Sequence, residues 1–376
     1  MRIKVAHLIN SYLPLTQGWM HNEIACNTEC DACVLCRYRQ HGDLFPLDSV
    51  YPVFDTYGMF ASLSMLLARI RARYPSGPYL EMIRREKPHL LHGHFAPEAW
   101  RSIDLVRATG LPLVVTFYGV DVDKLARRRA WQRRYLRLFD LGRLFIAEGP
   151  HMASRIAALG CPRDKIRVIY QAADAERVRR HAKRNASSEA VRVLYVGLAR
   201  RKKGPVHAVR AFADAARKAP SLELHIVGDG PFRRVTERIL SRAGMRKRVT
   251  YHGYVDPGRY LELLGSSDIL LAPSITAPDG DTEGGAPVCV IESLLAGVPV
   301  VGTTHCDIPH IVSHGETGLV CAEGDTGMLA ENLARLARDA GMRRRMAERA
   351  FAVAPARHDI RVRVKEITGA YRAVLA

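Results

Sequence analysis

Long apolar runs and low-complexity tracts are missing from this chain of 376 residues. Because no stretch of about 18 apolar residues occurs, we expect no segment that spans a bilayer. The start of the chain, MRIKVAHLIN, carries only a short apolar run, which is typical of a first strand and not of a signal peptide. With 48% apolar and 25% charged residues the composition is globular, and we expect a cytoplasmic protein.

Acidic residues are in short supply, because 38 Asp and Glu stand against 56 Lys and Arg, a formal net charge of +18. Much of the excess lies in residues 69–85 and 124–143. The second segment interleaves its basic residues with Leu125, Trp131, Tyr135, Leu136 and Phe139. This pattern is typical first of a solvated helix with an apolar inner face, and then of a helix on an anionic membrane surface. No recognised nucleic-acid motif accompanies it, so we expect no nucleic-acid partner, although a basic nucleic-acid-binding protein stays an alternative.

Cysteine is sparse, but four of the eight cysteines lie close together at Cys26, Cys30, Cys33 and Cys36. Their spacing matches the three-cysteine spacing of radical S-adenosylmethionine enzymes, so a cysteine-ligated iron–sulfur enzyme is an alternative function. Residues 32–37, however, predict a strand, which would turn Cys33 and Cys36 to opposite faces. We therefore expect buried free thiols.

Apolar strands alternate with helical segments twice along the chain, and this rhythm predicts two parallel, doubly wound α/β domains. The polar segment 171–190 is the predicted linker, and residues 205–218 predict a helix after the first strand of the second domain. The predicted strands cover residues 3–10, 32–37, 89–92, 113–117, 144–147, 166–170, 191–196, 222–227, 249–252 and 269–272.

The stretch from Pro278 to Gly302 predicts an acidic glycine loop, a short helix and a buried strand. Pro287 suits a first helical residue, and Gly297 suits a helix end in left-handed geometry. Within the apolar helix, Glu292 needs hydrogen-bond donors such as ribose hydroxyls. The helix start also offers backbone amides to a diphosphate. The expected apolar face of the helix consists of Val288, Ile291, Leu294 and Leu295.

The two glutamates Glu283 and Glu292, followed by GVPVV at 297–301, resemble the signature of retaining glycosyltransferase family 4. The family separates its glutamates by seven residues, whereas eight separate them here. Four further segments also resemble family elements: TFYGVD, VGLARRKKG, HIVGDGP and YHGYV.

The resemblance implies the GT-B fold, in which two Rossmann-like domains face a central cleft. Residues 1–175 would bind the acceptor and residues 176–355 a nucleotide sugar. The amphipathic tail 356–376 would pack back on the first domain. The implied reaction is retaining transfer, of hexosyltransferase type, to a sugar or lipid-linked acceptor in surface polysaccharide or glycolipid synthesis. A small soluble acceptor is the alternative. A peripheral contact with an anionic membrane would go with a lipid-linked acceptor.

The resemblance also implies residue roles. Lys203 matches a lysine that holds the diphosphate, but Leu198 stands at the arginine position, so Arg200 or Arg201 is expected to substitute. Tyr118 stands where the family has a histidine near the sugar, and with Lys203 and Glu283 it completes the predicted catalytic set. The acceptor side would be formed by His94, Gly119 and Asp121. Besides Arg200, Arg201 and the ribose contact Glu292, the predicted donor-binding residues are Gly18, Gly204, Gly228, Gly253, Tyr254, Gly284, Gly285, Ala286, Pro287 and Val288.

No cofactor and no metal is expected. The D-x-D element of Asp279 and Asp281 holds a metal in another glycosyltransferase fold, but there it follows a different strand context. We interpret it here as the rim of the acidic loop.

Overall fold

The computed structural model describes residues 2–14, 17–53, 74, 76–182, 190–197 and 200–376. The chain forms two units. The first comprises Met1–Tyr170 with Ile360–Ala376, and the second Gln171–Asp359.

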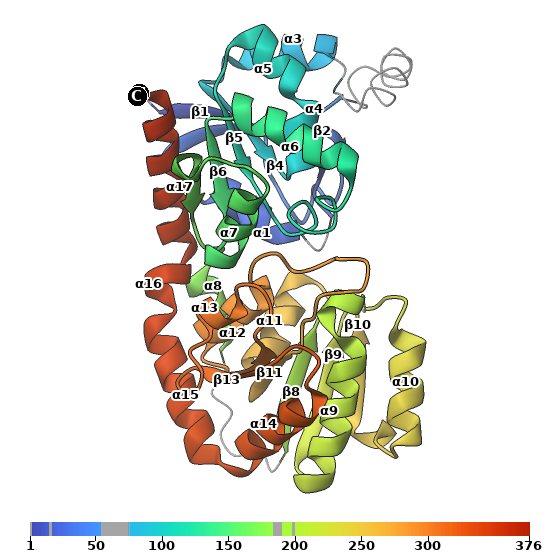
Figure 1. Cartoon of the computed structure of the whole chain (residues 1–376). Helices are drawn as coiled ribbons and strands as arrows, with labels where there is room; N and C mark the ends of the chain where they lie inside the picture. The colour runs from blue at the N-terminus through green and yellow to red at the C-terminus, as the bar shows by residue number, and fades with distance from the viewer. Residues whose placement is uncertain (1, 15–16, 54–73, 75, 183–189, 198–199) are drawn as a thin grey trace. The chain divides into compact units, whose positions relative to one another are not determined.

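The first unit is built on a parallel sheet with the strand order β3-β2-β1-β4-β5-β6-β7 (Figure 1). The order reverses between β1 and β4, so helices cover both faces and the switch point lies between these two strands. The strands are β1 (Ile3–Tyr12), β2 (Cys30–Arg39), β3 (Val50–Pro52), β4 (Leu90–His94), β5 (Leu113–Thr116), β6 (Leu144–Ala147) and β7 (Ile166–Val168).

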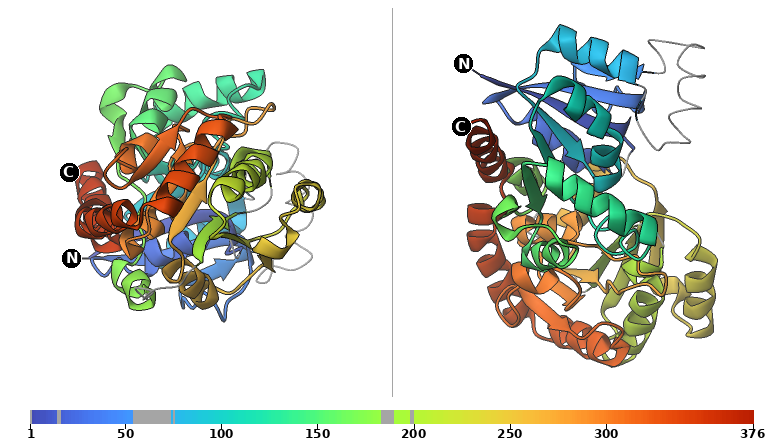
Figure 2. Two further views of the ribbon diagram at one scale, coloured as in Figure 1. Left: turned by 90° about the horizontal axis from the view of Figure 1, so that it is seen from below. Right: turned by 45° about the horizontal axis from the view of Figure 1, so that its top comes forward.

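The core of the first unit lies on both faces of this sheet. One face packs against α3 to α7, and the other packs against the last helix through Ile367 and Tyr371. Strand β1, near the start of the chain, and α17, at its end, thus belong to one unit (Figure 2). The helices are α1 (Gly18–Ala25), α3 (Ser76–Glu86), α4 (Ala96–Arg101), α5 (Ile103–Thr109), α6 (Arg129–Leu141), α7 (Pro150–Ala158) and α17 (Ile360–Leu375).

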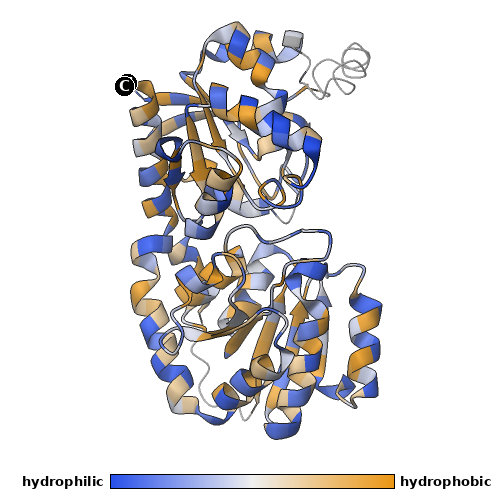
Figure 3. Ribbon diagram, in the orientation of Figure 1, coloured by the Kyte–Doolittle hydropathy of each residue, from blue (hydrophilic) through white to orange (hydrophobic). Residues whose placement is uncertain are grey.

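The second unit repeats the architecture with the order β10-β9-β8-β11-β12-β13, so its switch point lies between β8 and β11. Its central strands are mostly apolar, and the helices around them carry polar residues on their outer faces (Figure 3). The strands are β8 (Val191–Val196), β9 (Leu222–Val227), β10 (Val249–Gly253), β11 (Ile269–Ala272), β12 (Val300–Thr303) and β13 (Gly318–Cys321). The helices are α8 (Ala175–His181), α9 (Pro205–Lys218), α10 (Arg233–Arg242), α11 (Pro257–Gly265), α12 (Val288–Ala296), α13 (Ile308–Ile311), α14 (Thr326–Arg338), α15 (Ala340–Val353) and α16 (Pro355–His358).

The prediction that residues 171–190 form a linker is wrong for its first part. Residues 175–181 form α8, which begins with the Asp174 side chain accepting a hydrogen bond from the Arg177 N–H. Val178 packs into the core formed with α11 and α12. Residues 183–189 lie outside the described ranges.

The cysteine-rich stretch forms part of strand β2 and no ligand loop. Cys33 and Cys36 lie in different hydrophobic clusters on the two faces of the sheet, and Cys30 is in a third, beside α17. All are buried free thiols, and Cys26 is partly buried. Because these sulfur atoms do not converge, the iron–sulfur alternative is excluded. Within the described ranges, no helix has the length and apolar character needed to cross a bilayer.

Candidate functional site

The loops that follow β8 and β11 meet at the switch point of the second unit. The Ile275 N–H donates to the Lys202 carbonyl at 2.8 Å, which joins the two loops through their backbones. The Lys202 ammonium donates to the Thr282 carbonyl at 2.8 Å and pairs with Asp281 at 3.4 Å. In doubly wound sheets such a crossing of loops is where ligands bind.

A partly buried ion pair lies where these loops cross. Lys203 Nζ is 3.0 Å from Glu283 Oε1, which also accepts a hydrogen bond from the Ser274 hydroxyl at 3.2 Å. Burial works against both charges, but the carboxylate raises the pKa of Lys203 above its ordinary value. The ammonium groups of Lys203 and Lys202 likewise outweigh burial and lower the pKa of Glu283. Two residues predicted to be catalytic therefore lie in direct contact, both charged.

Gly204 lets the two loops approach each other. Its φ is 62°, and a Cβ atom there would lie 1.9 Å from the Pro273 carbonyl oxygen. Only glycine fits both the backbone conformation and the contact. Gly204 is thus a shaping residue of the lysine turn at 201–203.

The glycine loop before α12 offers backbone donors. The N–H groups of Gly285 and Ala286 have no acceptor among the residues that the structure describes, whereas the Gly284 N–H donates to the Thr282 hydroxyl at 3.0 Å. Two of the three amides expected to face a diphosphate are thus open to a ligand. Helix α12 begins one residue later than expected, with Pro287 as its N-cap. On its inner face Val290 is buried where Val288 was expected, since Val288 is partly exposed.

Glu292 lies on α12 in an apolar setting, as its sequence context predicts. Its carboxylate accepts a hydrogen bond from the Tyr260 hydroxyl of α11 at 2.6 Å. Burial raises the pKa of Glu292 to about 7, against the opposing effect of the Tyr260 hydrogen bond and of the Arg177 charge. The group can therefore change its charge near neutral pH.

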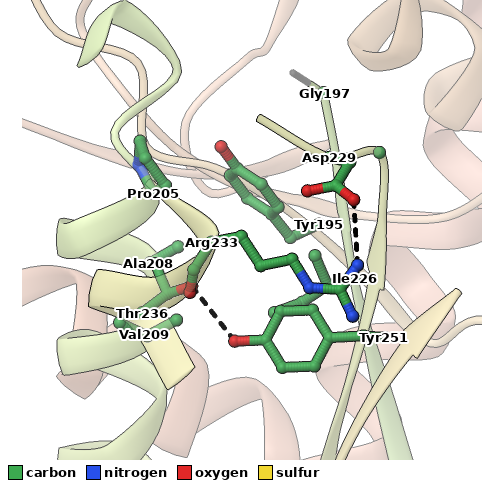
Figure 4. A pocket seen from close by; sticks show the side chains of 11 residues that line it. Tyr195, Gly197, Pro205, Ala208, Val209, Ile226, Asp229, Arg233, Thr236 and Tyr251 are labelled. Atoms are coloured by element: carbon green, nitrogen blue, oxygen red, sulfur yellow. Dashed lines mark hydrogen bonds and ion pairs between the residues drawn. The ribbon is translucent and has the colours of Figure 1, made fainter. Parts of the chain in front are cut away.

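A small cavity of about 20 Å³ lies beyond the ends of β8 and β9, against α9 and α10 (Figure 4). Tyr195, Ile226 and Tyr251 supply much of its wall. Its rim includes Gly228, and Arg233 reaches across to Asp229 at 2.9 Å. Gly228 is also joined to Gly253, since its N–H donates to the Gly253 carbonyl at 2.7 Å. Tyr254 follows directly, with 60% of its surface exposed.

The arginines expected to replace the family arginine differ in their surroundings. The Arg201 guanidinium lies 5.6 Å from the centre of the Phe232 ring. Arg200 is exposed and precedes the lysine turn as its N-cap. Leu198, at the family position, lies outside the described residues. Neither arginine is paired with Glu283, and the cation at that carboxylate is Lys203.

The first-unit residues expected near the sugar lie at the other switch point, after β1, β4 and β5. Gly18 is the first residue of α1, and residues 15–16 before it are outside the described ranges. Asp121 shapes its loop, because its carboxylate accepts the N–H groups of Ala96 at 3.0 Å and Tyr118 at 3.1 Å. Gly119, with φ of 111°, provides the turn between them.

His94 and Tyr118 are turned inward. His94 is fully buried, and its Nδ1 is 2.7 Å from the Tyr118 hydroxyl. The Tyr118 ring is covered by Trp19 and Phe95, with ring centres 4.7 and 4.5 Å away. In this conformation neither polar group faces solvent, so their contacts with acceptor and sugar stay predictions.

His94 belongs to a cluster with His7 and His92 whose ring nitrogens come close enough to hold a metal ion. Five of the six ring nitrogens, however, are already paired. His7 Nδ1 is 2.9 Å from His94 Nε2. His92 contacts the hydroxyls of Tyr371 at 2.7 Å and Thr116 at 2.8 Å. Burial lowers the pKa of His7 to about 3 and those of the other two well below the ordinary value. We therefore interpret the cluster as a neutral, hydrogen-bonded part of the core.

The acidic rim at 279–281 is tied into the loop. Asp281 pairs with Lys202, and its N–H donates to the Asp279 carboxylate at 3.2 Å. Lys202 thus lies beside one of the two carboxylates of the D-x-D element.

Sequence reasoning missed four residues of this site: Lys202, Tyr260, His305 and Glu323. His305 accepts the Glu283 N–H and contacts Glu323. Two of them could have been identified from their position after a strand, because His305 follows β12 and Glu323 follows β13 at the ligand-binding edge. The sequence analysis predicts no strand at β13, so it does not place Glu323 at this edge.

Two family models match the chain. The model of glycosyl transferases group 1 matches residues 177–353, and the model of Glycosyltransferase Family 4 matches residues 50–177. The two matches together run through both units.

Curated relatives agree with the family models. The putative colanic acid biosynthesis glycosyltransferase WcaL of Salmonella typhimurium is 29% identical over 248 residues, 65% of this chain and 60% of that protein. The amylovoran biosynthesis glycosyltransferase AmsK of Erwinia amylovora is 30% identical over 223 residues, 59% of this chain and 54% of that protein. Each match thus covers less than two thirds of the relative.

Solved structures extend the likeness to the whole chain. Anabaena Alr3699/HepE in complex with UDP superposes with a TM-score of 0.77 over 99% of this chain and 100% of that chain, at 17% identity. The lipopolysaccharide biosynthesis glycosyltransferase WaaG gives a TM-score of 0.68 over 97% of this chain and 99% of that one, at 16% identity. The predicted GT-B fold is confirmed.

Proposed function

This chain belongs to glycosyltransferase family 4, and from that premise we propose that it transfers a sugar from a nucleoside diphosphate sugar to an acceptor, with retention of configuration. The observation that carries the proposal is the Lys203–Glu283 pair at the switch point of the second unit. An ammonium and two open backbone amides there suit a diphosphate, and the carboxylate suits sugar hydroxyls.

The transfer requires that the negative charge developing on the departing diphosphate be stabilised. In the proposed step the acceptor oxygen forms a bond to the anomeric carbon while the bond from that carbon to the diphosphate oxygen breaks. The diphosphate oxygen takes the acceptor proton on the same face, which preserves the configuration. Lys203 and the Gly285 and Ala286 amides stabilise the departing charge. No protein nucleophile and no metal takes part.

We place the nucleoside along the edge formed by β9, β10 and α12. Glu292 would accept hydrogen bonds from ribose hydroxyls, in competition with Tyr260. Exposed Tyr254 offers a ring for stacking on the base, next to Gly253. The complex of HepE with UDP supports a nucleoside diphosphate as the ligand class.

We propose a carbohydrate acceptor of surface polysaccharide synthesis, held by the first unit. The names of WcaL and AmsK, which refer to colanic acid and amylovoran biosynthesis, support this assignment. A lipid carrier on that acceptor would bring the enzyme to a membrane surface.

The test of the proposal is binding of UDP, GDP and ADP, by thermal shift and then by calorimetry. We expect one of them to stabilise the protein, and Lys203→Met to weaken its binding about tenfold or more. The matched control is Lys218→Met, because Lys218 also pairs with a glutamate of this unit, Glu331, but at the surface. Equal affinity of Lys203→Met and the wild-type protein would remove Lys203 from the site.

We further propose that α6 contacts anionic lipids through its outer face. The aromatic residues expected to enter a membrane are unavailable, because Trp131, Tyr135 and Phe139 are buried in the core. The outer face instead presents exposed arginines and Leu136, which is 59% exposed. This leaves an electrostatic contact, worth about 1 kcal/mol per basic residue at low salt. The segment 69–85, the other basic stretch, is only partly described.

Vesicle sedimentation tests this contact. Vesicles rich in phosphatidylglycerol should bind the protein at low salt and release it at high salt, since screening shortens the range of the attraction. The double variant Arg133→Gln/Arg137→Gln should bind less. Arg344→Gln/Arg345→Gln, two exposed arginines of α15, is the matched control. Equal binding by both double variants would contradict a contact through α6.

A further inference from the structure

We infer that His305 is a positioning residue that holds Glu283 in its working place through the Glu283 backbone. The inference rests on the proposed role of Glu283 in glycosyl transfer. His305 follows β12, has no exposed surface, and accepts the Glu283 N–H at its Nε2, 3.0 Å away.

His305 links the loop after β12, in which it lies, to the loops after β11 and β13. Its Nδ1 is 2.6 Å from Glu323 Oε1, and Glu323 follows β13. The other oxygen of Glu323 accepts the Thr276 N–H at 2.7 Å. Thr276 and Glu283 lie near the two ends of the long loop after β11. The loops after β11, β12 and β13, adjacent strands of the sheet, are therefore joined at one imidazole and one carboxylate.

The partners of His305 fix its tautomer. Burial opposes the charge of Glu323, but hydrogen bonds from Thr276 and His305 lower its pKa, so the carboxylate is ionised and can only accept. His305 Nδ1 must then donate, which leaves a lone pair on Nε2 for the Glu283 N–H. The Cys306 thiol, 3.2 Å from Nε2, shares that lone pair. A protonated Nε2 would turn a donor toward the Glu283 N–H and break the contact.

The backbone contact matters most when substrate is bound. Without ligand, the Glu283 carboxylate is held by Lys203 and Ser274. A diphosphate at Lys203 would compete for the same ammonium and weaken that hold. The His305 contact uses the Glu283 backbone N–H, which a diphosphate on Lys203 leaves alone. It therefore keeps the loop in register while the side chain turns to the sugar.

Hydrogen exchange of the free protein tests the contact without any substrate. His305→Ala should speed exchange of the peptide covering residues 276–286 by about tenfold, because one backbone hydrogen bond and one link between loops are lost. His305→Gln, whose amide carries one acceptor and one donor, should restore much of the protection. The control is His314→Ala, since His314 also accepts a backbone N–H, that of Val320, at 3.1 Å in the same unit. Unchanged exchange at 276–286 in His305→Ala would overturn the inference.

A binding and turnover assay separates this inference from the proposed function. With whichever of UDP, GDP and ADP stabilises the wild-type protein as the probe, His305→Ala should keep its affinity within about threefold, because Lys203 stays in place, whereas turnover of the corresponding nucleotide sugar should fall about thirtyfold or more. Rescue of turnover by His305→Gln is expected. Loss of affinity for this nucleotide equal to the loss of turnover would make His305 merely structural. Failure of the wild-type protein to bind any nucleoside diphosphate would instead refute the proposed function, whatever the exchange result.

Discussion

At the scale of single residues, Glu292 shows how burial tunes a carboxyl group toward neutral pH. It lies among apolar residues of α12, and burial raises its pKa to about 7. A ribose diol needs an acceptor, which the ionised form provides best. Binding of a nucleotide should therefore favour the ionised form and release a proton near pH 7.

This coupling predicts the pH dependence of nucleotide binding. Between pH 6 and pH 8, the affinity of the wild-type protein for the nucleoside diphosphate that it binds should rise by up to about tenfold as Glu292 ionises, beyond the change caused by the phosphate itself. Glu292→Gln should bind this nucleotide more weakly and lose this extra dependence. Calorimetry across that range is the measurement. Glu262→Gln, an exposed glutamate of α11 paired with Arg259, should behave like the wild type. A pH profile shared by both variants would show that Glu292 does not touch the nucleotide.

The same carboxyl group affects stability in the opposite direction. Its folded pKa of about 7 lies above the unfolded value, so the native state keeps a proton that the unfolded chain releases. Between about pH 4.5 and 7 this group therefore makes the protein less stable as pH rises. Stability lost here is the cost of keeping a titratable carboxyl group in an apolar helix.

The role of a site residue could be predicted from the sequence where both the residue and its contact partner lie in recognisable motifs. Lys203 and Glu283 stand in recognisable segments, and the structure brings them into contact. Eight residues separate Glu283 from Glu292 where the family has seven, so the motif alone does not define the role of Glu283. The loop geometry shows that its carboxylate contacts Lys203 and Ser274. His305 has no motif of its own here. Its role depends on Glu323, eighteen positions away, and such a pairing is invisible without the sheet order.

At the scale of elements, the lysine turn after β8 depends on one glycine. Gly204 has a positive φ and touches Pro273 of the next loop, so two separate requirements coincide at one position. A side chain there would push apart the loops that carry Lys203 and Glu283.

Gly204→Ala should therefore lower the free energy of unfolding of the second unit by more than about 2 kcal/mol, and also weaken the proposed binding of a nucleoside diphosphate. The matched control is Gly244→Ala. Gly244 also has a positive φ, 72°, but an added Cβ would meet nothing within 4 Å, so only the backbone cost of about 1 kcal/mol applies. Urea unfolding followed by far-UV circular dichroism measures both. Equal losses in the two variants would show that the Pro273 contact is unimportant.

Elements were predictable where apolar periodicity is strong. Strands β8, β9 and β11 and helix α9 have the predicted bounds, since their apolar residues are continuous or regularly spaced. Strand β3 has only three residues and ends in a proline, and β13 begins with a glycine, so neither shows the continuous apolar run of β11. Helix α8 was missed because its sequence is mostly charged, and its stability comes from the Asp174 cap and from packing of Val178.

At the scale of the whole molecule, the chain leaves the first unit after Tyr170 and returns to it with α17. The returning helix is fastened by Arg363, which has no exposed surface. Its guanidinium lies 2.6 Å from the carboxylate of Glu23 in α1 and donates to the carbonyls of Ile169 at 3.0 Å and Tyr170 at 2.7 Å. One side chain thus connects α17, α1 and the segment that directly follows β7.

Removing one member of a buried ion pair leaves the other charge without compensation. Arg363→Met should therefore destabilise the first unit by about 3–5 kcal/mol, whereas Arg372→Met, on the same helix, should cost less than about 1 kcal/mol. Arg372 pairs with Glu29 at 2.8 Å, but 63% of its side chain is exposed. The readout is selective, because all three tryptophans, Trp19, Trp100 and Trp131, belong to the first unit. Urea unfolding by tryptophan fluorescence should shift strongly for Arg363→Met, and restored stability in Arg363→Met/Glu23→Leu would identify the unpaired carboxylate as the cause. Equal midpoints for Arg363→Met and Arg372→Met would mean that α17 is held by its apolar face alone.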